Sequence, residues 1–189
     1  MTWPFEPLRM FGYDVIVADP PWRFVTRSEK RVEKMPQRYY RCRDLEWIKS
    51  LPVRLLARES ALLFLWATNP MLPLQHDVLC AWGFRYKTAL CWRKLTKNGK
   101  PRPGLGYVAR SFHEPILVGG IGNCIQKHAL PSLFDGEARE HSRKPDEFYD
   151  LVRRATPHAK RCDLFACEDR PGFAGWGDQM GKFDAERVA

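Results

Sequence analysis

A buried strand that stops at two prolines is the feature that most limits how this chain can fold. The run Tyr13-Asp14-Val15-Ile16-Val17-Ala18 is mostly apolar and is followed at once by Asp19-Pro20-Pro21. Proline has no amide hydrogen to give to a sheet, so the strand has to end there. A short apolar run of this kind is typical of a parallel strand that helices cover on both faces. Because ligands bind beyond the carboxyl ends of such strands, Asp19 stands where chemistry is expected.

Apolar strands alternate with helical segments along the rest of the chain. The expected strands cover residues 61–67, 84–93, 114–118 and 161–166, and the expected helices cover 44–58 with a break at Pro52, 70–82, and a segment that begins at Pro145 and stops before Pro157. Residues 94–110 predict a long loop and 120–140 irregular structure. This order indicates an α/β sandwich with a largely parallel sheet. No repeat or linker divides the 189 residues, so we expect one domain over 1–189.

Positive charge is concentrated in two segments. The chain has 31 Lys and Arg against 22 Asp and Glu, a formal net charge of +9. Residues 23–43 carry eight basic and two acidic side chains, and residues 85–110 carry eight basic and no acidic ones. A surface that follows phosphates needs such concentration, since each neutralised phosphate releases counterions. The pattern favours a nucleic-acid partner, although two solvated loops would have the same composition.

Several classes of protein are disfavoured by what the sequence lacks. No apolar run approaches the roughly 20 residues that span a bilayer. The first residues show no charged region followed by an apolar one that would mark the chain for export. The six cysteines include no C-x-x-C pair, which disfavours a zinc site and a disulfide framework. We therefore expect reduced thiols, no metal and a cytoplasmic protein.

The tetrapeptide Asp19-Pro20-Pro21-Trp22 suits the activation of a planar amine. The lone pair of the exocyclic amine of adenine is delocalised into the ring, so this nitrogen attacks a methyl sulfonium poorly. A carboxylate and a backbone carbonyl fixed by the prolines can accept its two N–H groups, which localises the lone pair and stabilises the positive charge that develops on nitrogen. Trp22 offers a flat face for a base drawn out of its stack. The plain alternative is an Asp-Pro turn with Trp22 packed in the core.

Further motifs follow the tetrapeptide in a fixed order. They are LWATN at 65–69, WGF at 82–84, HSRKPDE at 141–147, DLF at 163–165 and WGDQ at 176–179. With ADPPW, they resemble the MT-A70 family of adenine methyltransferases, above all its short bacterial and prophage members, from about Phe11 to Gln179. The resemblance implies a Rossmann-like S-adenosylmethionine-dependent methyltransferase fold with a permuted order, in which the catalytic motif precedes the cofactor-binding strand. It also implies methylation of N6 of adenine in nucleic acid.

The resemblance assigns roles to individual residues. Asp19, Pro20, Pro21 and Trp22 match the catalytic tetrapeptide. Lys144, just before a helix, matches the lysine that meets the methionine carboxylate of S-adenosylmethionine. The other cofactor-binding residues that it implies are Asp19, Phe165, Asp178 and Gln179. The residues expected to contact the nucleic acid are Tyr40, Arg110, His113 and Glu114, to which the basic loop adds Lys97, Lys100 and Arg102.

Two positions depart from the family pattern. Cys167 stands where most members have an arginine after Leu-Phe-x, and Asp178 stands where many have asparagine. Asp178 can accept a hydrogen bond from a ribose hydroxyl but cannot donate one as an amide would. Cysteine offers neither a charge nor a strong donor. We predict either weaker cofactor binding or a replacement for the missing arginine, with Arg170 as the nearest candidate.

Three functions remain open. The first is an active adenine N6 methyltransferase, with DNA favoured over RNA as its substrate. The second is a non-catalytic nucleic-acid-binding subunit on the same fold, which the intact tetrapeptide disfavours. The third is methyl transfer to another planar amine, such as cytosine or a glutamine side chain, which Trp22 and the surrounding motifs disfavour. The small size suggests loose sequence specificity or a homodimer, and the resemblance suggests a bacterial or phage-encoded protein associated with the nucleoid through DNA.

Overall fold

The centre of the molecule is a seven-stranded sheet with the strand order β5-β3-β4-β2-β1-β6-β7. The computed structural model describes residues 2–22, 43–104, 106, 108–123 and 125–184. The strands are β1 (Tyr13–Ala18), β2 (Ala57–Trp66), β3 (Arg85–Leu95), β4 (His113–Ile121), β5 (Leu133–Glu137), β6 (Arg161–Leu164) and β7 (Phe173–Trp176). The helices are α1 (Leu45–Ser50), α2 (Leu72–Ala81) and α3 (Asp146–Ala155), with short 3-10 turns η3 (Val53–Leu56) and η4 (Asn69–Met71).

Strand direction decides which residues meet at the end of β1. β1 pairs in parallel with β2 and β6, and β6 pairs in parallel with β7. β4 is antiparallel to both of its neighbours, β2 and β3, and is alone in this among the strands that the structure describes. The expected α/β sandwich with a largely parallel sheet is therefore confirmed. Because β4 is reversed, its first residues lie beside the last residues of β2 and β3, at the edge that we call the carboxyl edge.

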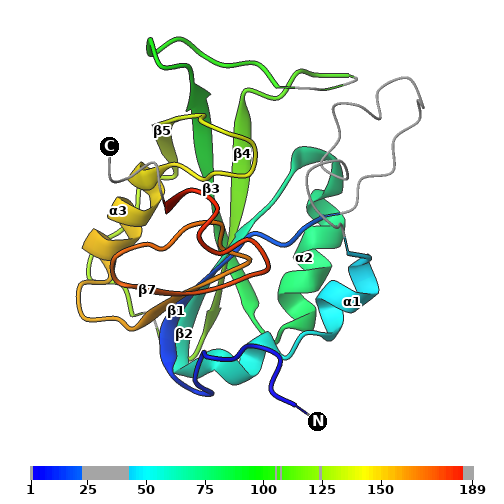
Figure 1. Ribbon diagram of the computed structural model, residues 1–189, viewed down its shortest axis with the longest axis vertical. Coiled ribbons are helices and arrows are strands. Elements are labelled where there is room, and N and C mark those ends of the chain that lie inside the picture. Colours follow the sequence, from blue (N-terminus) through cyan, green and yellow to red (C-terminus); the bar gives the residue numbers. More distant parts are fainter. Residues whose placement is uncertain (1, 23–42, 105, 107, 124, 185–189) are drawn as a thin grey trace.

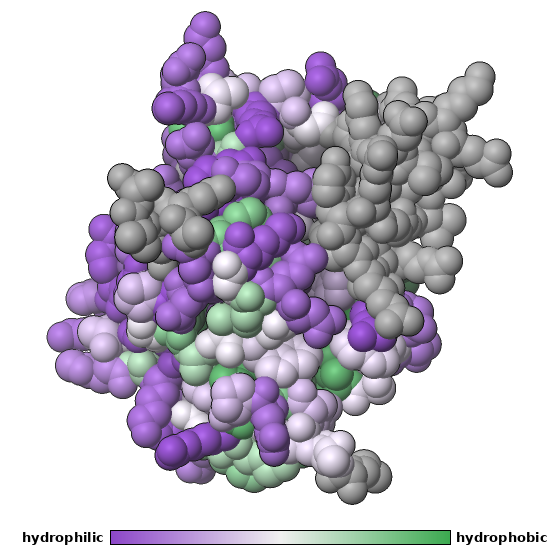
Figure 2. All heavy atoms as spheres, in the orientation of Figure 1, coloured by the Kyte–Doolittle hydropathy of each residue, from purple (hydrophilic) through white to green (hydrophobic). Residues whose placement is uncertain are grey.

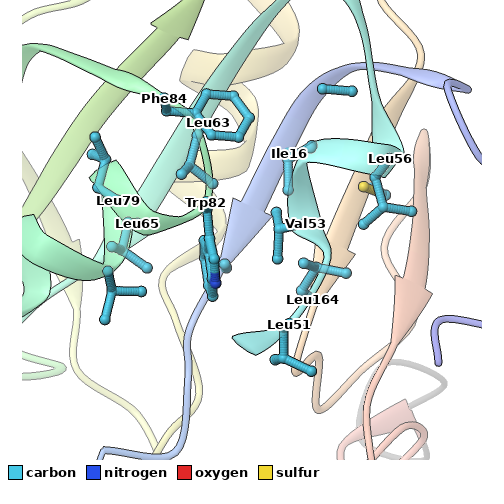
Figure 3. Close-up of a cluster of buried hydrophobic side chains, with 14 of the residues drawn as sticks. Ile16, Leu51, Val53, Leu56, Leu63, Leu65, Leu79, Trp82, Phe84 and Leu164 are labelled. Atoms are coloured by element: carbon cyan, nitrogen blue, oxygen red, sulfur yellow. The ribbon is translucent and has the colours of Figure 1, made fainter. Parts of the chain in front are cut away.

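Helices cover both faces of the sheet, with α1 and α2 on one side and α3 on the other (Figure 1). Side chains along a strand point alternately to the two faces. In β1, Ile16 belongs to the cluster that also contains Leu79 and Trp82 of the α2 region, part of which is drawn in Figure 3. Its neighbour Val17 belongs to the second cluster, which contains Phe148 of α3. The apolar residues of β1 are thus used on both faces, as the uninterrupted apolar run predicts.

Several predicted boundaries are wrong. The strand expected at 61–67 begins earlier, at Ala57, so the helical segment 44–58 is reduced to α1 and η3. The loop expected from residue 94 begins after Leu95, and Leu95 pairs with Pro101 across a tight turn. Two short edge strands were not expected: β5 lies within 120–140, and β7 contains only four residues. Both are too short to show a period, and their pairing with β3 and β6 makes them strands.

The expected absence of a membrane span, of disulfides and of a metal site can be compared only with the part of the chain that the structure describes. No helix there has the length and apolar character needed to cross a membrane. The four cysteines described, Cys80, Cys91, Cys162 and Cys167, are free thiols. Within the same residues, His, Cys, Asp and Glu side chains form no group of three or more that could hold a metal ion.

Candidate active site

The tetrapeptide lies at the carboxyl edge, directly after β1. The Asp19 amide donates to the Leu164 carbonyl at 3.2 Å, which ties the tetrapeptide to the end of β6. The Pro20 carbonyl accepts from the Trp22 amide at 2.8 Å, and the Pro21 carbonyl accepts from the Arg43 amide at 3.1 Å. Each carbonyl oxygen has two lone pairs, so both can still accept one further hydrogen bond. The geometry leaves room for the carbonyl role that the sequence predicts.

The carboxylate of Asp19 is part of a chain of alternating charges. The ammonium of Lys144 lies 3.0 Å from Oδ2 of Asp19 and 3.1 Å from Oε2 of Glu114. Glu114 pairs through its other oxygen with Lys94 of β3. The Lys144 ammonium also lies 4.8 Å from the centre of the Trp66 ring. Glu114 can join this chain because β4 is reversed and begins at the carboxyl edge.

Burial and neighbouring charges shift the titration of these groups in opposite directions. Burial raises the pKa of Asp19, although the Lys144 ammonium opposes this shift. Burial alone would also raise the pKa of Glu114, but the ammonium groups of Lys144 and Lys94 outweigh it and lower that pKa to about 2. Burial would lower the pKa of Lys144, but the two carboxylates outweigh it and raise that pKa. Asp19 is therefore the carboxylate of the pair that takes up a proton more readily.

A small cavity of about 20 Å³ lies beside Asp19. Its lining includes Lys144 and, from the segment after β6, Phe165 and Cys167. Two lining residues that are not glycine have a left-handed backbone, Ser142 with φ of 71° and Phe165 with φ of 63°. Such conformations cost energy, persist only where the surroundings fix them, and gather at ligand sites. The two strained positions mark the cavity as a candidate ligand site at the carboxyl edge.

Trp22 does not present a free face for stacking. Its side chain is 4% exposed and belongs to the core cluster of Ile16 and Leu65. Its indole nitrogen donates to the Trp66 carbonyl at 3.2 Å. The expectation of a stacking face is therefore corrected, because the hydrogen bond and the apolar surroundings hold this indole in the core. Trp22 is packed in the core, which is the alternative to a stacking role that the sequence left open.

The residues expected around the cofactor lie close to one another but do not all reach the cavity. Asp19, Lys144, Phe165 and Arg170 line it, whereas Asp178 and Gln179 are absent from its lining. Oε1 of Gln179 lies 3.8 Å from the Cys167 sulfur, so it is one contact away from the cavity wall. Asp178 is exposed. Arg170 is 5% exposed, and its guanidinium is occupied by protein groups, including Glu168 and the Lys144 carbonyl.

Except for Tyr40, the residues expected to contact nucleic acid lie in the connection between β3 and β4 or at the start of β4. Lys97, Lys100 and Arg110 are exposed. Figure 2 shows hydrophilic side chains at the end of the molecule where this connection projects. The Arg102 guanidinium instead donates to the backbone carbonyls of Ala138 and Arg139. His113 contacts Asn69 at 3.2 Å, and Glu114 belongs to the charge chain described above. Tyr40 and residues 23–42 lie outside the described residues.

Sequence reasoning missed a buried acid in the cavity wall. Asp163 of β6 is 4% exposed, and burial raises its pKa to about 7. The Tyr149 hydroxyl of α3 donates to its Oδ2 at 2.8 Å. The one available signal was an acidic residue within the expected strand 161–166, of which the structure forms Arg161–Leu164. Lys94 was also missed, because the sequence assigns it to a loop.

Comparisons with known proteins show which sequences this chain is similar to. The sequence model of the MT-A70 family matches residues 13–179. A probable N(6)-adenosine-methyltransferase MT-A70-like from Oryza sativa subsp. japonica is 30% identical over 92% of this chain and 23% of its own length. The type II methyltransferase M.MunI of Mycoplasma sp. is 27% identical over 92% of this chain and 80% of its own length. The human N(6)-adenine-specific methyltransferase METTL4 is 27% identical over 90% of this chain and 38% of its own length.

The matches cover most of this chain but only part of the length of many of its relatives. The chain spans less than a third of the length of the plant relatives that it matches. The family match, in contrast, begins at the first residue of β1 and ends at Gln179, so it contains the tetrapeptide, Lys144 and the entire sheet. This chain belongs to the MT-A70 family.

Proposed function

We propose that the protein transfers a methyl group from S-adenosylmethionine to N6 of adenine in nucleic acid, with DNA as the preferred substrate. The observation that carries the proposal is the Asp19 carboxylate at the carboxyl edge, 3.0 Å from the largely buried Lys144 ammonium and beside the cavity. Family membership supports the reaction class. An intact tetrapeptide favours a catalytic role over that of a binding subunit.

Asp19 is the residue that acts on the amine. Its carboxylate accepts one N–H of adenine, and the Pro20 or Pro21 carbonyl accepts the other, so that the lone pair of the nitrogen is directed out of the ring plane. When bound, S-adenosylmethionine supplies an electrophilic methyl group on a sulfonium. The methylated amine carries an extra proton, which Asp19 is suited to accept because burial raises the pKa of its carboxyl group.

The residues of the cavity fit the amino-acid end of S-adenosylmethionine. A carboxylate needs a cation, and the Lys144 side chain supplies one while remaining 13% exposed. Lys144 now shares its ammonium between Asp19 and Glu114, so a bound carboxylate would join or replace the Glu114 contact. The Phe165 ring, held by edge contacts with Trp47 and Trp176, provides apolar surface on the same wall.

The preference for DNA has separate support. M.MunI, a type II methyltransferase, is matched over 80% of its length, so it is a relative of about the same size as this chain. Relatives named for RNA or adenosine are matched over smaller shares, such as 52% for the RNA methyltransferase MTA1 of Cryphonectria parasitica. The exposed lysines of the β3–β4 connection would contact phosphates of either polymer.

We keep the homodimer as a prediction, which light scattering of the pure protein tests.

The experiment is the incubation of pure protein with isotope-labelled S-adenosylmethionine and matched duplex DNA, single-stranded DNA and RNA. Digestion to nucleosides and mass spectrometry should show labelled N6-methyladenine, with more product from DNA than from RNA. The Asp19→Asn variant is the matched control for contaminating activity. Label on cytosine, or on no nucleoside at all, would contradict the proposed reaction, and more product from RNA would reverse the proposed substrate.

A further inference from the structure

The backbone carbonyl of Lys144 is held by two arginines, one that precedes it in the sequence and one that follows it. Its carbonyl accepts from Nη2 of Arg139 at 3.0 Å and from Nη2 of Arg170 at 2.9 Å. The carboxylate of Asp146, two residues later, pairs with the same two arginines, at 3.1 Å from Nη1 of Arg139 and also with Nη1 of Arg170. We call Arg139, Asp146 and Arg170 the arginine clamp.

Within the clamp, Arg170 is fixed by contacts with an aromatic ring and a buried carboxylate. The guanidinium carbon of Arg170 lies 3.7 Å from the centre of the Tyr149 ring. Its Nη2 also pairs with Glu168, which is 2% exposed. Glu168 in turn lies 3.3 Å from the guanidinium of Arg143, a buried neighbour of Lys144. A guanidinium taken out of water costs several kcal/mol unless partners use its donors, so this arrangement fixes Arg170 in one position.

The clamp acts on a segment that needs external support. Lys144 comes two residues after Ser142, whose φ of 71° is left-handed, and directly before Pro145, which precedes the first residue of α3. The strained backbone at Ser142 and the proline directly after Lys144, which disfavours a helical conformation at Lys144, keep this segment out of α3. The direction of the Lys144 side chain therefore depends on where its carbonyl is held.

We propose that the arginine clamp, and Arg170 in particular, positions the Lys144 ammonium on Asp19 and Glu114, and that Arg170 acts on cofactor binding through Lys144 rather than by contact. This inference rests on the proposed function for its catalytic meaning. It also answers the question raised by Cys167. The guanidinium three residues later does not replace a missing cofactor contact but is directed to the backbone of the residue that makes one.

The first test needs no cofactor. Lys144 and Lys94 lower the pKa of Glu114 to about 2, so displacement of the Lys144 ammonium must raise that pKa. Carboxyl titration by nuclear magnetic resonance should show a higher Glu114 pKa in Arg170→Ala than in the unchanged protein, and an intermediate value in Arg170→Lys. An unchanged Glu114 pKa in a folded Arg170→Ala variant would overturn the proposal, whatever the protein methylates.

The second test uses two cofactor analogues. S-adenosylhomocysteine carries the amino-acid carboxylate, whereas methylthioadenosine lacks it. Calorimetry should show that Arg170→Ala weakens S-adenosylhomocysteine roughly tenfold, in line with the loss of a charge-assisted hydrogen bond, and leaves methylthioadenosine within about twofold. In a Lys144→Met background, Arg170→Ala should change neither affinity further, because residues that act in series are not additive. Equal weakening of both analogues would assign Arg170 to the fold or to direct contact instead.

Arg153 is the matched control. It also binds a backbone carbonyl, that of Pro171 at 2.9 Å, a carboxylate, that of Asp150, and an aromatic ring, that of Phe173, but it does not touch Lys144. Arg153→Ala should leave the Glu114 pKa and both affinities unchanged. If it changes them as Arg170→Ala does, a general loss of stability explains the effect and the clamp has no positioning role.

If the unchanged protein binds neither analogue while the Glu114 titration behaves as expected, the proposed function fails and the structural part of the clamp stands.

Discussion

Charged side chains are used in opposite ways in two regions of this molecule. At the carboxyl edge, Asp19, Glu114 and Lys144 are largely buried, and the Lys144 ammonium lies within 3.1 Å of each of the two carboxylates. In the β3–β4 connection, Lys97 and Lys100 are exposed. Buried pairs interact strongly and hold a fixed geometry, whereas exposed charges are screened by salt and retain side-chain freedom. The first arrangement suits chemistry that requires precise placement, and the second suits attraction of a polyanion.

The largest expected effect is the loss of turnover when Asp19, one of the buried charges, is replaced. Asp19→Asn retains the size of the side chain but removes the charge that stabilises the methylated amine. We expect turnover to fall by a factor of about a hundred or more, as for the loss of one preorganised charge-stabilising group. Steady-state methylation assays measure it, and the melting temperature confirms the fold. Asp14→Asn, at the opposite end of β1 and paired with Arg58, is the control and should retain full turnover. Near-normal turnover in Asp19→Asn would make the tetrapeptide structural.

The second prediction concerns the stability cost of a buried acid. Between about pH 4 and pH 7 the unfolded chain releases the Asp163 proton, while the folded chain, with the pKa raised to about 7 by burial, retains it. The unfolded state then binds fewer protons, so rising pH destabilises the fold. Asp163→Asn should remove this loss, which is at most on the order of 4 kcal/mol, and should raise the melting temperature more at pH 8 than at pH 4.

The control for this prediction is an exposed acid in β5. Asp135 pairs with Arg93 across β5 and β3, and its pKa is lowered by that guanidinium. Asp135→Asn should therefore give no gain in stability at pH 8, since exposed pairs contribute little. Thermal melts of both variants from pH 4 to pH 8 make the comparison. A stability gain for Asp163→Asn that does not depend on pH would mean that Asp163 is ionised or solvated in the folded protein.

The third prediction concerns the exposed charges. Replacing Lys97, Lys100 and Arg110 together with alanine should weaken binding to all nucleic-acid sequences. The slope of log affinity against log salt should become shallower by up to about three units, about 0.9 for each lost phosphate contact on duplex DNA. Affinity for S-adenosylhomocysteine should not change. Fluorescence titrations at several salt concentrations measure the slope.

A control for charge alone comes from the other end of β3. Arg85 and Lys87 are exposed, but they lie at the start of an eleven-residue strand, roughly 30 Å from its end. Arg85→Ala with Lys87→Ala should leave the salt slope nearly unchanged. Arg102→Ala should also change the slope less than Lys97→Ala, because its guanidinium is bound to backbone carbonyls. An equal effect from all these positions would indicate attraction by net charge rather than by a defined surface.

The smallest expected effect is a shift in the acid limb of the pH profile. Activity requires ionised Asp19, so it should fall as the pH drops through the pKa of this group. Glu114→Gln removes a negative charge that raises that pKa and should move the acid limb to lower pH. Lys144→Met removes the positive charge that lowers it and should move the limb to higher pH. Profiles of kcat/KM against pH distinguish the two, and shifts in the same direction would show that another group controls the limb.

Local sequence determined much of the fold. The apolar run that ends at Asp19-Pro20-Pro21 defines β1 and its end, because proline cannot continue a ladder. Proline followed by two acids places the start of α3 at Asp146. These signals act over a few residues, and the structure confirms both elements. The order of the motifs also predicted the family, which the match over residues 13–179 confirms.

Only the tertiary structure decided how the site is assembled. Apolar patterns report burial but not strand direction, so the reversal of β4, which brings Glu114 to Lys144, could not be seen. Composition joined residues 85–110 into one basic segment, but β3 extends through it and separates its two ends. The burial of Trp22 and the direction of the Arg170 guanidinium depend on partners more than twenty residues away, Trp66 and Lys144. Such contacts are set by packing, and a single sequence carries no local signal for them.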